Sequence, residues 1–293
     1  MVRQPFNACL YNKGSDFLNR LFHTPSRRAR QFLPLFVLVP AALAAVLMLA
    51  ASLAQYDGPD ANYFSRGAVL PVLAAIFAAI SAVAGTVIAL LFPKNAFPTD
   101  SIPAPFASVA SAAGCLLCAI FLAASTAHTG LKWYHVVTLL LLLVSVAYFV
   151  LRACDRFTEA LRDITVLLGI APVFGLIFLC AIHYFDKTVE MNAPVKVLTL
   201  LGLLTAMVTV TNGIRYLLGT ALPRLHLALS SWTVAAGALS LFAIPALFLG
   251  GAFDKTVYLA SFFIILGYTV ASSVRIVFLI RNANSSDKEE SQS

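Results

Sequence analysis

The sequence predicts an all-α integral membrane protein, a polytopic bundle of eight transmembrane helices. The first observation is composition: 60% of the 293 residues are hydrophobic and 11% are charged, whereas soluble domains carry about 25% charged residues. The second is a mean hydropathy of +0.88. The third is the grouping of the hydrophobic residues into long uncharged stretches, each close to the roughly 20 residues that a membrane-crossing helix needs.

The eight stretches that contain no Asp, Glu, Lys or Arg define the expected spans. They are 31–56, 67–93, 101–131, 133–151, 164–185, 197–214, 225–253 and 256–274. Transmembrane β-strands would instead alternate polar and apolar residues in segments of about ten residues. The sixth and eighth spans extend past their stretches, because Lys196, Arg215 and Arg275 can reach the interface from near the helix ends.

The chain divides into three expected regions. Residues 1–30 form a basic cytoplasmic segment, residues 31–281 the eight-helix transmembrane domain, and residues 282–293 a disordered polar tail. The apolar run at 32–54 is longer than the 7–15 residues or so of a signal peptide's hydrophobic region. We therefore interpret the first span as a retained anchor.

The basic residues predict the orientation. Eight spans place both termini on one side, and that side holds fifteen Lys and Arg residues against five on the other. Cytoplasmic loops carry the excess of Lys and Arg, so both termini are expected in the cytoplasm and the chain in the cell membrane. The five on the opposite side are Arg66, Lys132, Lys187, Lys196 and Lys255.

A short repeat suggests how the spans are organised. The sequence Phe-Asp-Lys-Thr-Val occupies 185–189 and recurs at 253–257, each time after an odd-numbered span. Equivalent positions in the topology favour a duplicated helical hairpin. The repeat therefore predicts a bundle of four stacked hairpins.

Polar rows on the later spans provide the candidate site. No Asp or Glu falls in the middle of a span, which argues against proton-coupled carriers and intramembrane acid–base enzymes. Hydroxyl and amide residues instead recur at helical spacing on spans four, six, seven and eight. The candidate cavity and anion site consists of Arg152, Thr205, Thr209, Asn212, Arg215, Tyr268, Ser272 and Arg275.

Two interpretations of these rows remain open. In the first, they line a cavity with Arg152, Arg215 and Arg275 at its cytoplasmic mouth, and Arg215 and Arg275 converge on an anion from inside the bundle. In the second, small and hydroxylated residues only let the helices pack, and each arginine reaches separately into the headgroup layer. The first interpretation predicts a small anionic solute or an anionic lipid as ligand.

Cysteine and histidine clusters offer weaker alternatives. Cys115 and Cys118 share a helix face, but both continue rows of small residues typical of helix packing. Histidines and carboxylates near one interface resemble a metal site only in composition, and their spacing matches no closed zinc motif. These residues are His128, His135, His183, Asp186 and Asp254.

No nucleotide-binding, zinc-protease or nucleophile motif occurs. We therefore expect no catalytic site, cofactor, metal or nucleic-acid partner. The predicted function is permease-like handling of a small or amphipathic anionic solute or lipid. The alternative is a non-catalytic scaffold, accessory subunit or envelope sensor that binds partner membrane helices.

The region 184–224 resembles a family of uncharacterised multi-pass membrane proteins of clostridia and related Gram-positive bacteria. The resemblance rests on the aromatic-Asp loop at 184–186, on Asn192, Pro194 and Lys196, and on the end of span six around Arg215. Some of these proteins carry an acidic residue where this chain has Gly213. The resemblance implies a bacterial plasma membrane and no assigned activity.

Overall fold

The computed structural model describes residues 27–57, 63–65, 67–92, 104–130, 132–154, 159–187, 189–218, 220, 222–243 and 255–283. Within these residues the regular structure is helical except for one short antiparallel pair, β1 (Tyr56–Asp57) with β2 (Tyr63–Phe64), and short irregular segments join the elements. The helices are α2 (Arg27–Ala54), α3 (Leu70–Leu91), α4 (Ala104–Thr129), α5 (Trp133–Ala153), α6 (Glu159–Leu168), α7 (Ile170–Phe185), α8 (Pro194–Leu217), α9 (Pro223–Ala243) and α11 (Lys255–Arg281).

The prediction of an eight-helix membrane bundle is confirmed. Eight helical segments in the described chain are long and apolar enough to cross a membrane, and each overlaps one predicted stretch. The fifth, 163–185, is divided into α6 and α7 at Gly169, three residues before Pro172. Proline inside a helix removes a backbone hydrogen bond and bends the helix. Pro172 therefore accounts for the interruption at Gly169. The apolar surface of these helices implies a lipid bilayer around the protein.

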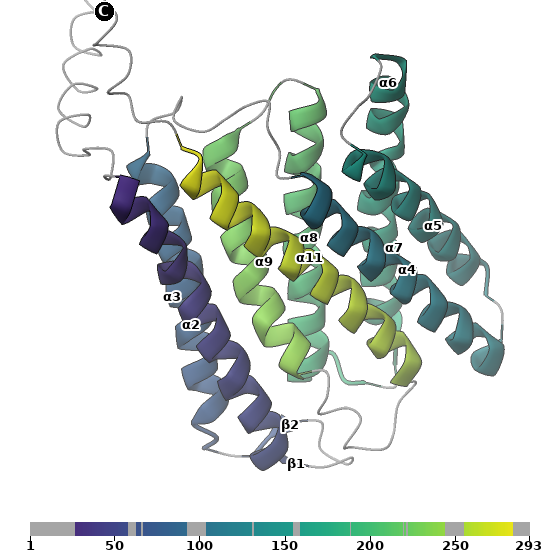
Figure 1. Ribbon diagram of the computed structural model, residues 1–293. Coiled ribbons are helices and arrows are strands. Elements are labelled where there is room, and N and C mark those ends of the chain that lie inside the picture. The colour runs from purple at the N-terminus through teal and green to yellow at the C-terminus, as the bar shows by residue number, and fades with distance from the viewer. Residues whose placement is uncertain are drawn as a thin grey trace, which may run out of the picture.

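Figure 1 shows the two ends of the bundle, and the sequence places different cations at each of them. The end at which α2 begins and α11 finishes holds Arg30, Arg152, Arg215, Arg224, Arg275 and Arg281, and we name it the arginine end. The opposite end, which includes the β1–β2 pair, holds Lys132, Lys187 and Lys196, and we name it the lysine end. The segments 1–26 and 284–293 lie outside the described residues.

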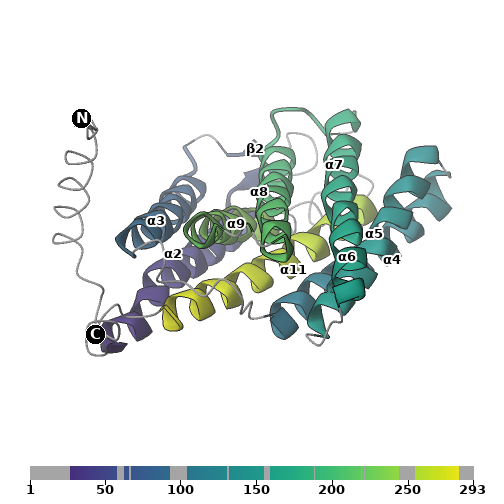
Figure 2. The ribbon, with the colours of Figure 1, turned by 90° about the horizontal axis from the view of Figure 1, so that it is seen from above.

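The last hairpin occupies the centre of the bundle. Each expected pair of consecutive spans packs together: α2 with α3, α4 with α5, α7 with α8, and α9 with α11. However, α9 packs against α2, α3 and α8, and α11 packs against α2, α4 and α8. Seen from above, α2, α11 and α4 form one row and α3, α9, α8 and α7 another (Figure 2). The hairpins are thus arranged around the last one rather than stacked in chain order.

The most extensive helix contact is the crossing of α4 and α11. Gly114 and Gly267 meet there, and a Cβ on Gly267 would lie 2.7 Å from the Ala110 carbonyl oxygen. Small residues let two backbones approach this closely. Cys115 and Cys118 lie on the same face of α4 and are fully buried, so the packing interpretation of these residues agrees with their position.

The middle of the bundle is packed with apolar side chains. Leu122, Leu142, Leu176, Leu179 and Leu203 are at most 1% exposed and belong to one continuous core. This core separates the polar residues of the arginine end from those of the lysine end.

Candidate anion site at the arginine end

The structure separates the three predicted arginines. Arg152 is 4% exposed and Arg275 is 2% exposed, whereas Arg215 is an exposed residue on the perimeter. The expectation that Arg215 faces the bundle interior is therefore wrong. Thr205, Thr209, Asn212 and Tyr216 share one face of α8, and Arg215 lies roughly 90° away from the centre of that face at 100° per residue.

Arg152 extends from the last turn of α5 into the bundle. It follows Tyr148 by four residues, on the helix face that also buries Ser145. Its Nη1 donates to the Tyr148 hydroxyl at 2.8 Å, and its Nη2 donates to the Gly213 carbonyl oxygen of α8 at 3.3 Å. Its Nε has no hydrogen-bond partner in the described chain. Both Nη atoms of this guanidinium are therefore held by protein, and its Nε–H is left without an acceptor.

Arg275 approaches the same region from α11. Its charge interacts with that of Arg152 and with the phenol groups of Tyr148, Tyr216 and Tyr268. Its Nε is buried and has no hydrogen-bond partner in the part of the chain that the structure describes. We name Arg152, Arg275, Tyr148, Tyr216 and Tyr268 the arginine cluster. Two like charges are thus brought together within it.

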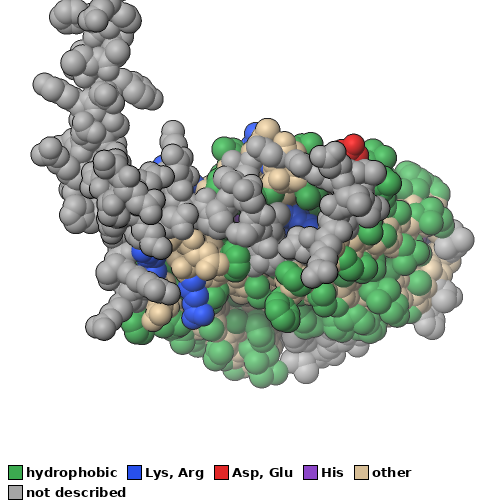
Figure 3. All heavy atoms as spheres, turned by 45° about the horizontal axis from the view of Figure 1, so that its top comes forward, with side chains coloured by type: hydrophobic (Ala, Val, Ile, Leu, Met, Phe, Trp, Pro, Cys, Tyr) green, Lys and Arg blue, Asp and Glu red, His purple; other side chains and the backbone are tan. Residues whose placement is uncertain are grey.

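No ion pair between a described Asp or Glu and either buried arginine is present. Asp163, the described carboxylate of α6, is exposed. Asp155, three residues after Arg152, lies outside the described residues. Figure 3 tips the arginine end toward the viewer and shows a few separate blue patches of Lys and Arg side chains, with one red patch at the edge.

Helices α8 and α9 close the site with uncharged groups. The Asn212 Nδ2 donates to the His226 Nδ1 at 3.2 Å, and the Tyr216 and His226 rings lie edge to face with centroids 5.1 Å apart. The Asn212 Oδ1 and the Tyr216 hydroxyl have no partner among the described residues. The Arg152–Gly213 and Asn212–His226 hydrogen bonds therefore bring α5, α8 and α9 together beside Arg152.

The sequence did not single out His226 or Gly213 as neighbours of the arginines. A Cβ on Gly213 would lie 3.5 Å from the Arg152 Nη1 and 3.7 Å from the His226 Cε1. A signal was present for Tyr148, which precedes Arg152 by one helical turn. No such sequence signal exists for His226, because its distance from Arg152 in the chain hides the fact that the two residues are neighbours.

The predicted site residues Thr205 and Thr209 serve helix packing. The Thr209 and Thr233 hydroxyls lie 2.7 Å apart across α8 and α9, and Thr233 also donates to the Thr205 carbonyl oxygen at 3.1 Å. The Tyr268 hydroxyl lies 3.7 Å from the Cys115 sulfur, and Ser272 is buried. These contacts join neighbouring helices, so Thr205 and Thr209 line a packed seam rather than a cavity.

The metal interpretation gains no support from the described chain, where no group of three or more His, Cys, Asp or Glu side chains is close enough to hold an ion. His183 Nε2 and the Ser261 hydroxyl form a hydrogen bond of 2.5 Å between α7 and α11. His135 lies on α5 instead. The side chains of His128 and Asp254 lie outside the described residues.

The arrangement is suited to binding a negatively charged group. Guanidinium groups recognise carboxylates and phosphates through paired N–H donors, and two such groups meet here beside phenol, amide and imidazole. Nothing in the arginine cluster resembles a nucleophile with an adjacent base. Comparison with known proteins adds no relative: no protein-family model, no curated protein and no solved structure matches this chain.

Proposed function

We propose that this membrane protein binds an anionic group between Arg152 and Arg275 and handles an amphipathic anionic solute or lipid in the manner of a permease. One observation carries the proposal: two guanidinium groups are buried, each has an Nε without a hydrogen-bond partner, and neither has a carboxylate partner in the described chain. An unpaired buried charge costs several kcal/mol. A bound anion removes that cost for both arginines at once.

The contacts around the arginines favour a compact anionic head. Arg152 is held in place by Tyr148 and Gly213, which fixes its orientation before a ligand arrives. The free Tyr216 hydroxyl and Asn212 Oδ1 supply one further donor and one acceptor. A carboxylate or phosphate with a neighbouring hydroxyl matches this set of groups.

The packed middle of the bundle favours a second candidate, a non-catalytic scaffold, accessory subunit or sensor. A permease needs a route between the two ends in at least one conformation. The apolar core of Leu122, Leu142, Leu176 and Leu179 closes that route here. In this second function, the arginine cluster anchors an anionic lipid headgroup and the exposed apolar faces of the helices receive partner helices.

We further infer that the protein is a bacterial plasma-membrane protein with both termini in the cytoplasm. The distribution of arginines and lysines over the two ends supports this orientation. Reporter fusions after Arg281 are expected to be active in the cytoplasm, and fusions at Asp186 outside it. Cytoplasmic activity at Asp186 would reverse the assignment.

Native mass spectrometry of detergent-solubilised protein tests the anion site. Anionic lipid or solute is expected to remain on the wild type, and to be lost from Arg152→Gln and Arg275→Gln. Arg215→Gln is the matched control, because it removes an arginine of the same end that is exposed. Equal retention by all four proteins would contradict the site. Asp155→Asn adds a check: if it frees the site for more ligand, Asp155 is the native counter-ion.

A further inference from the structure

A cavity lies at the lysine end, away from the arginine cluster. It has a volume of about 610 Å³ and lies between the first turn of α5, the last two turns of α7 and the start of α11. Ligand pockets commonly measure about 300–1,000 Å³ and have mostly apolar walls with a few polar groups. This cavity has that size and that composition.

The walls are aromatic and aliphatic. Trp133, Tyr134, Phe178, Ile182 and Phe185 form most of the lining. Trp133 is 71% exposed and Phe185 is 74% exposed, so the cavity opens at the perimeter of the bundle. Aromatic residues at such a position mark the membrane interface, where an acyl chain and its headgroup are both accessible.

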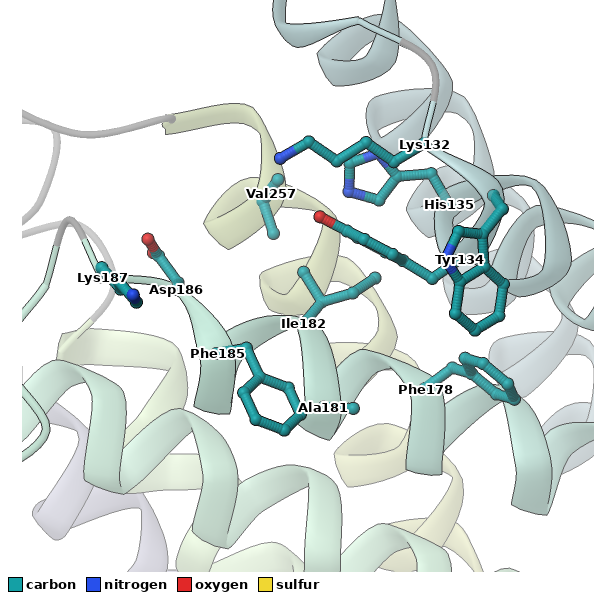
Figure 4. A pocket seen from close by; sticks show the side chains of 11 residues that line it. Lys132, Tyr134, His135, Phe178, Ala181, Ile182, Phe185, Asp186, Lys187 and Val257 are labelled. Carbon is teal, nitrogen blue, oxygen red and sulfur yellow. The ribbon is translucent and has the colours of Figure 1, made fainter.

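The polar groups lie on the opposite side of the cavity from Phe178 and Phe185 (Figure 4). The Lys132 ammonium lies 5.8 Å from the centre of the Tyr134 ring, and Lys187 and Asp186 complete this side. Lys132 is also the residue that precedes α5, and its side chain does not cap the helix. The positive end of the α5 dipole therefore adds to the positive charge of the lysine.

We propose that this cavity binds a monoanionic amphiphile, with the anionic head beside Lys132 and the apolar chain along Phe178, Ile182 and Phe185. Two lysines and one aspartate leave one positive charge in the lining at neutral pH. A single negative charge balances that value, whereas a dianionic head would be repelled by Asp186. The amphiphile reaches the cavity either as a membrane lipid or from water.

Tryptophan fluorescence tests this proposal directly, because Trp133 lines the cavity and the chain contains only one other tryptophan, Trp232. Trp232→Phe leaves Trp133 as the sole reporter. This protein is placed in phosphatidylcholine nanodiscs that contain increasing fractions of brominated phosphatidylglycerol or brominated phosphatidylcholine. Phosphatidylglycerol is expected to reach half-maximal quenching at a mole fraction about fivefold lower, the size expected for one partly exposed charge pair.

Lys132→Gln in the same background is expected to abolish the difference between the two brominated lipids. Arg281→Gln, which removes an exposed cation at the other end, is the control for general attraction to anionic lipid and is expected to retain the difference. Equal quenching by the two lipids before any lysine is changed would overturn the proposal. So would a difference that survives Lys132→Gln.

Octanoate and octyl glucoside identify the source of the amphiphile. Octyl glucoside is the uncharged counterpart of octanoate. If octanoate relieves the bromolipid quenching and octyl glucoside does not, the cavity accepts a water-borne monoanion. If octanoate gives no relief, the amphiphile is a membrane lipid. This inference is independent of the proposed function: Arg152→Gln and Arg275→Gln must leave the Trp133 preference unchanged. Loss of the preference in those variants would contradict a separate site.

Discussion

The two ends of the bundle bury cations in different ways. At the lysine end, Lys196 is 1% exposed, and its ammonium donates to the carbonyl oxygens of Asp186 at 2.6 Å and Val189 at 3.2 Å. The sequence predicted that this lysine would reach the interface. Instead, the loop after α7 folds over it. At the arginine end, Arg275 is equally buried, yet no described residue accepts a hydrogen bond from its Nε.

This difference separates structural from ligand-binding charge. The ammonium of Lys196 is stabilised by two backbone carbonyl oxygens of a neighbouring loop. Among the described residues, Arg152 bonds one phenol and one carbonyl oxygen, and the Nε atoms of both Arg152 and Arg275 have no partner. A buried cation that the protein itself satisfies holds the fold together, whereas one that it leaves unsatisfied favours an anion from outside.

The largest expected effect is at the satisfied site. Lys196→Met removes the ammonium that donates to the partly buried Asp186 carbonyl oxygen and the buried Val189 carbonyl oxygen, at up to about 1–3 kcal/mol each. We expect the free energy of unfolding to fall by roughly 3 kcal/mol, which lowers the melting temperature in detergent by roughly 6–12 °C. Lys187→Met, at an exposed lysine of the same end, is expected to change stability by less than about 0.5 kcal/mol. Similar losses in both variants would remove the distinction.

Arg275→Met is expected to act in the opposite way. Removing an unpaired buried charge that faces another arginine leaves the ligand-free protein as stable as the wild type or more stable. The stabilisation by a bound anion disappears instead, which amounts to about 2.7 kcal/mol at a ligand concentration of 100 times Kd. Melting curves with and without inorganic phosphate or phosphatidylglycerol measure both quantities. A destabilised ligand-free variant would show that the arginine is structural, as Lys196 is.

Gly213 allows the arginine end to be converted into a self-satisfied site. A Cβ here fits beside Arg152 at ordinary contact distance, so Gly213→Asp places a carboxylate next to the guanidinium, and Gly213→Asn places an amide of the same shape. We expect the Asp variant to be more stable than the Asn variant by about 1–2 kcal/mol without ligand. It should also be insensitive to added anion. Equal stability of the two variants, with phosphate still stabilising both, would mean that Arg152 is not available for pairing.

The sequence predicts the fold well because membrane physics leaves few choices. Uncharged stretches of about 20 residues must become helices in a bilayer, and all eight did. The order of helices around the bundle could not be derived in the same way. The α4–α11 crossing depends on Gly114 and Gly267, which are distant in the chain and meet only through tertiary packing.

The candidate site was predictable in part: the burial of two of the three predicted arginines follows from the sequence pattern. Arg152 and Arg275 end polar rows that face the interior, and both are buried. Arg215 lies at the end of the sixth span, roughly 90° from the centre of the polar face at 100° per residue, and is exposed. The neighbouring helices decide which face of that turn is buried. Lys196 shows the same limit. Whether a cation near a helix end reaches water or a loop carbonyl depends on the conformation of that loop.

The smallest effect is expected between the two ends, where neither charge nor ligand is held. Cys115 and Cys118 are fully buried in the apolar core, and the single polar contact of this pair in the described chain is the weak one from Cys115 to Tyr268. Replacing both with Ala removes one sulfur from each without introducing a polar group. We expect a loss of stability of about 1–2 kcal/mol, with phosphate and lipid binding unchanged. If these residues instead carried redox chemistry, the double variant would fold and yet fail to restore function in a deletion strain. Retained function together with a modest loss of stability would identify the thiols as packing groups that separate two independently acting ends.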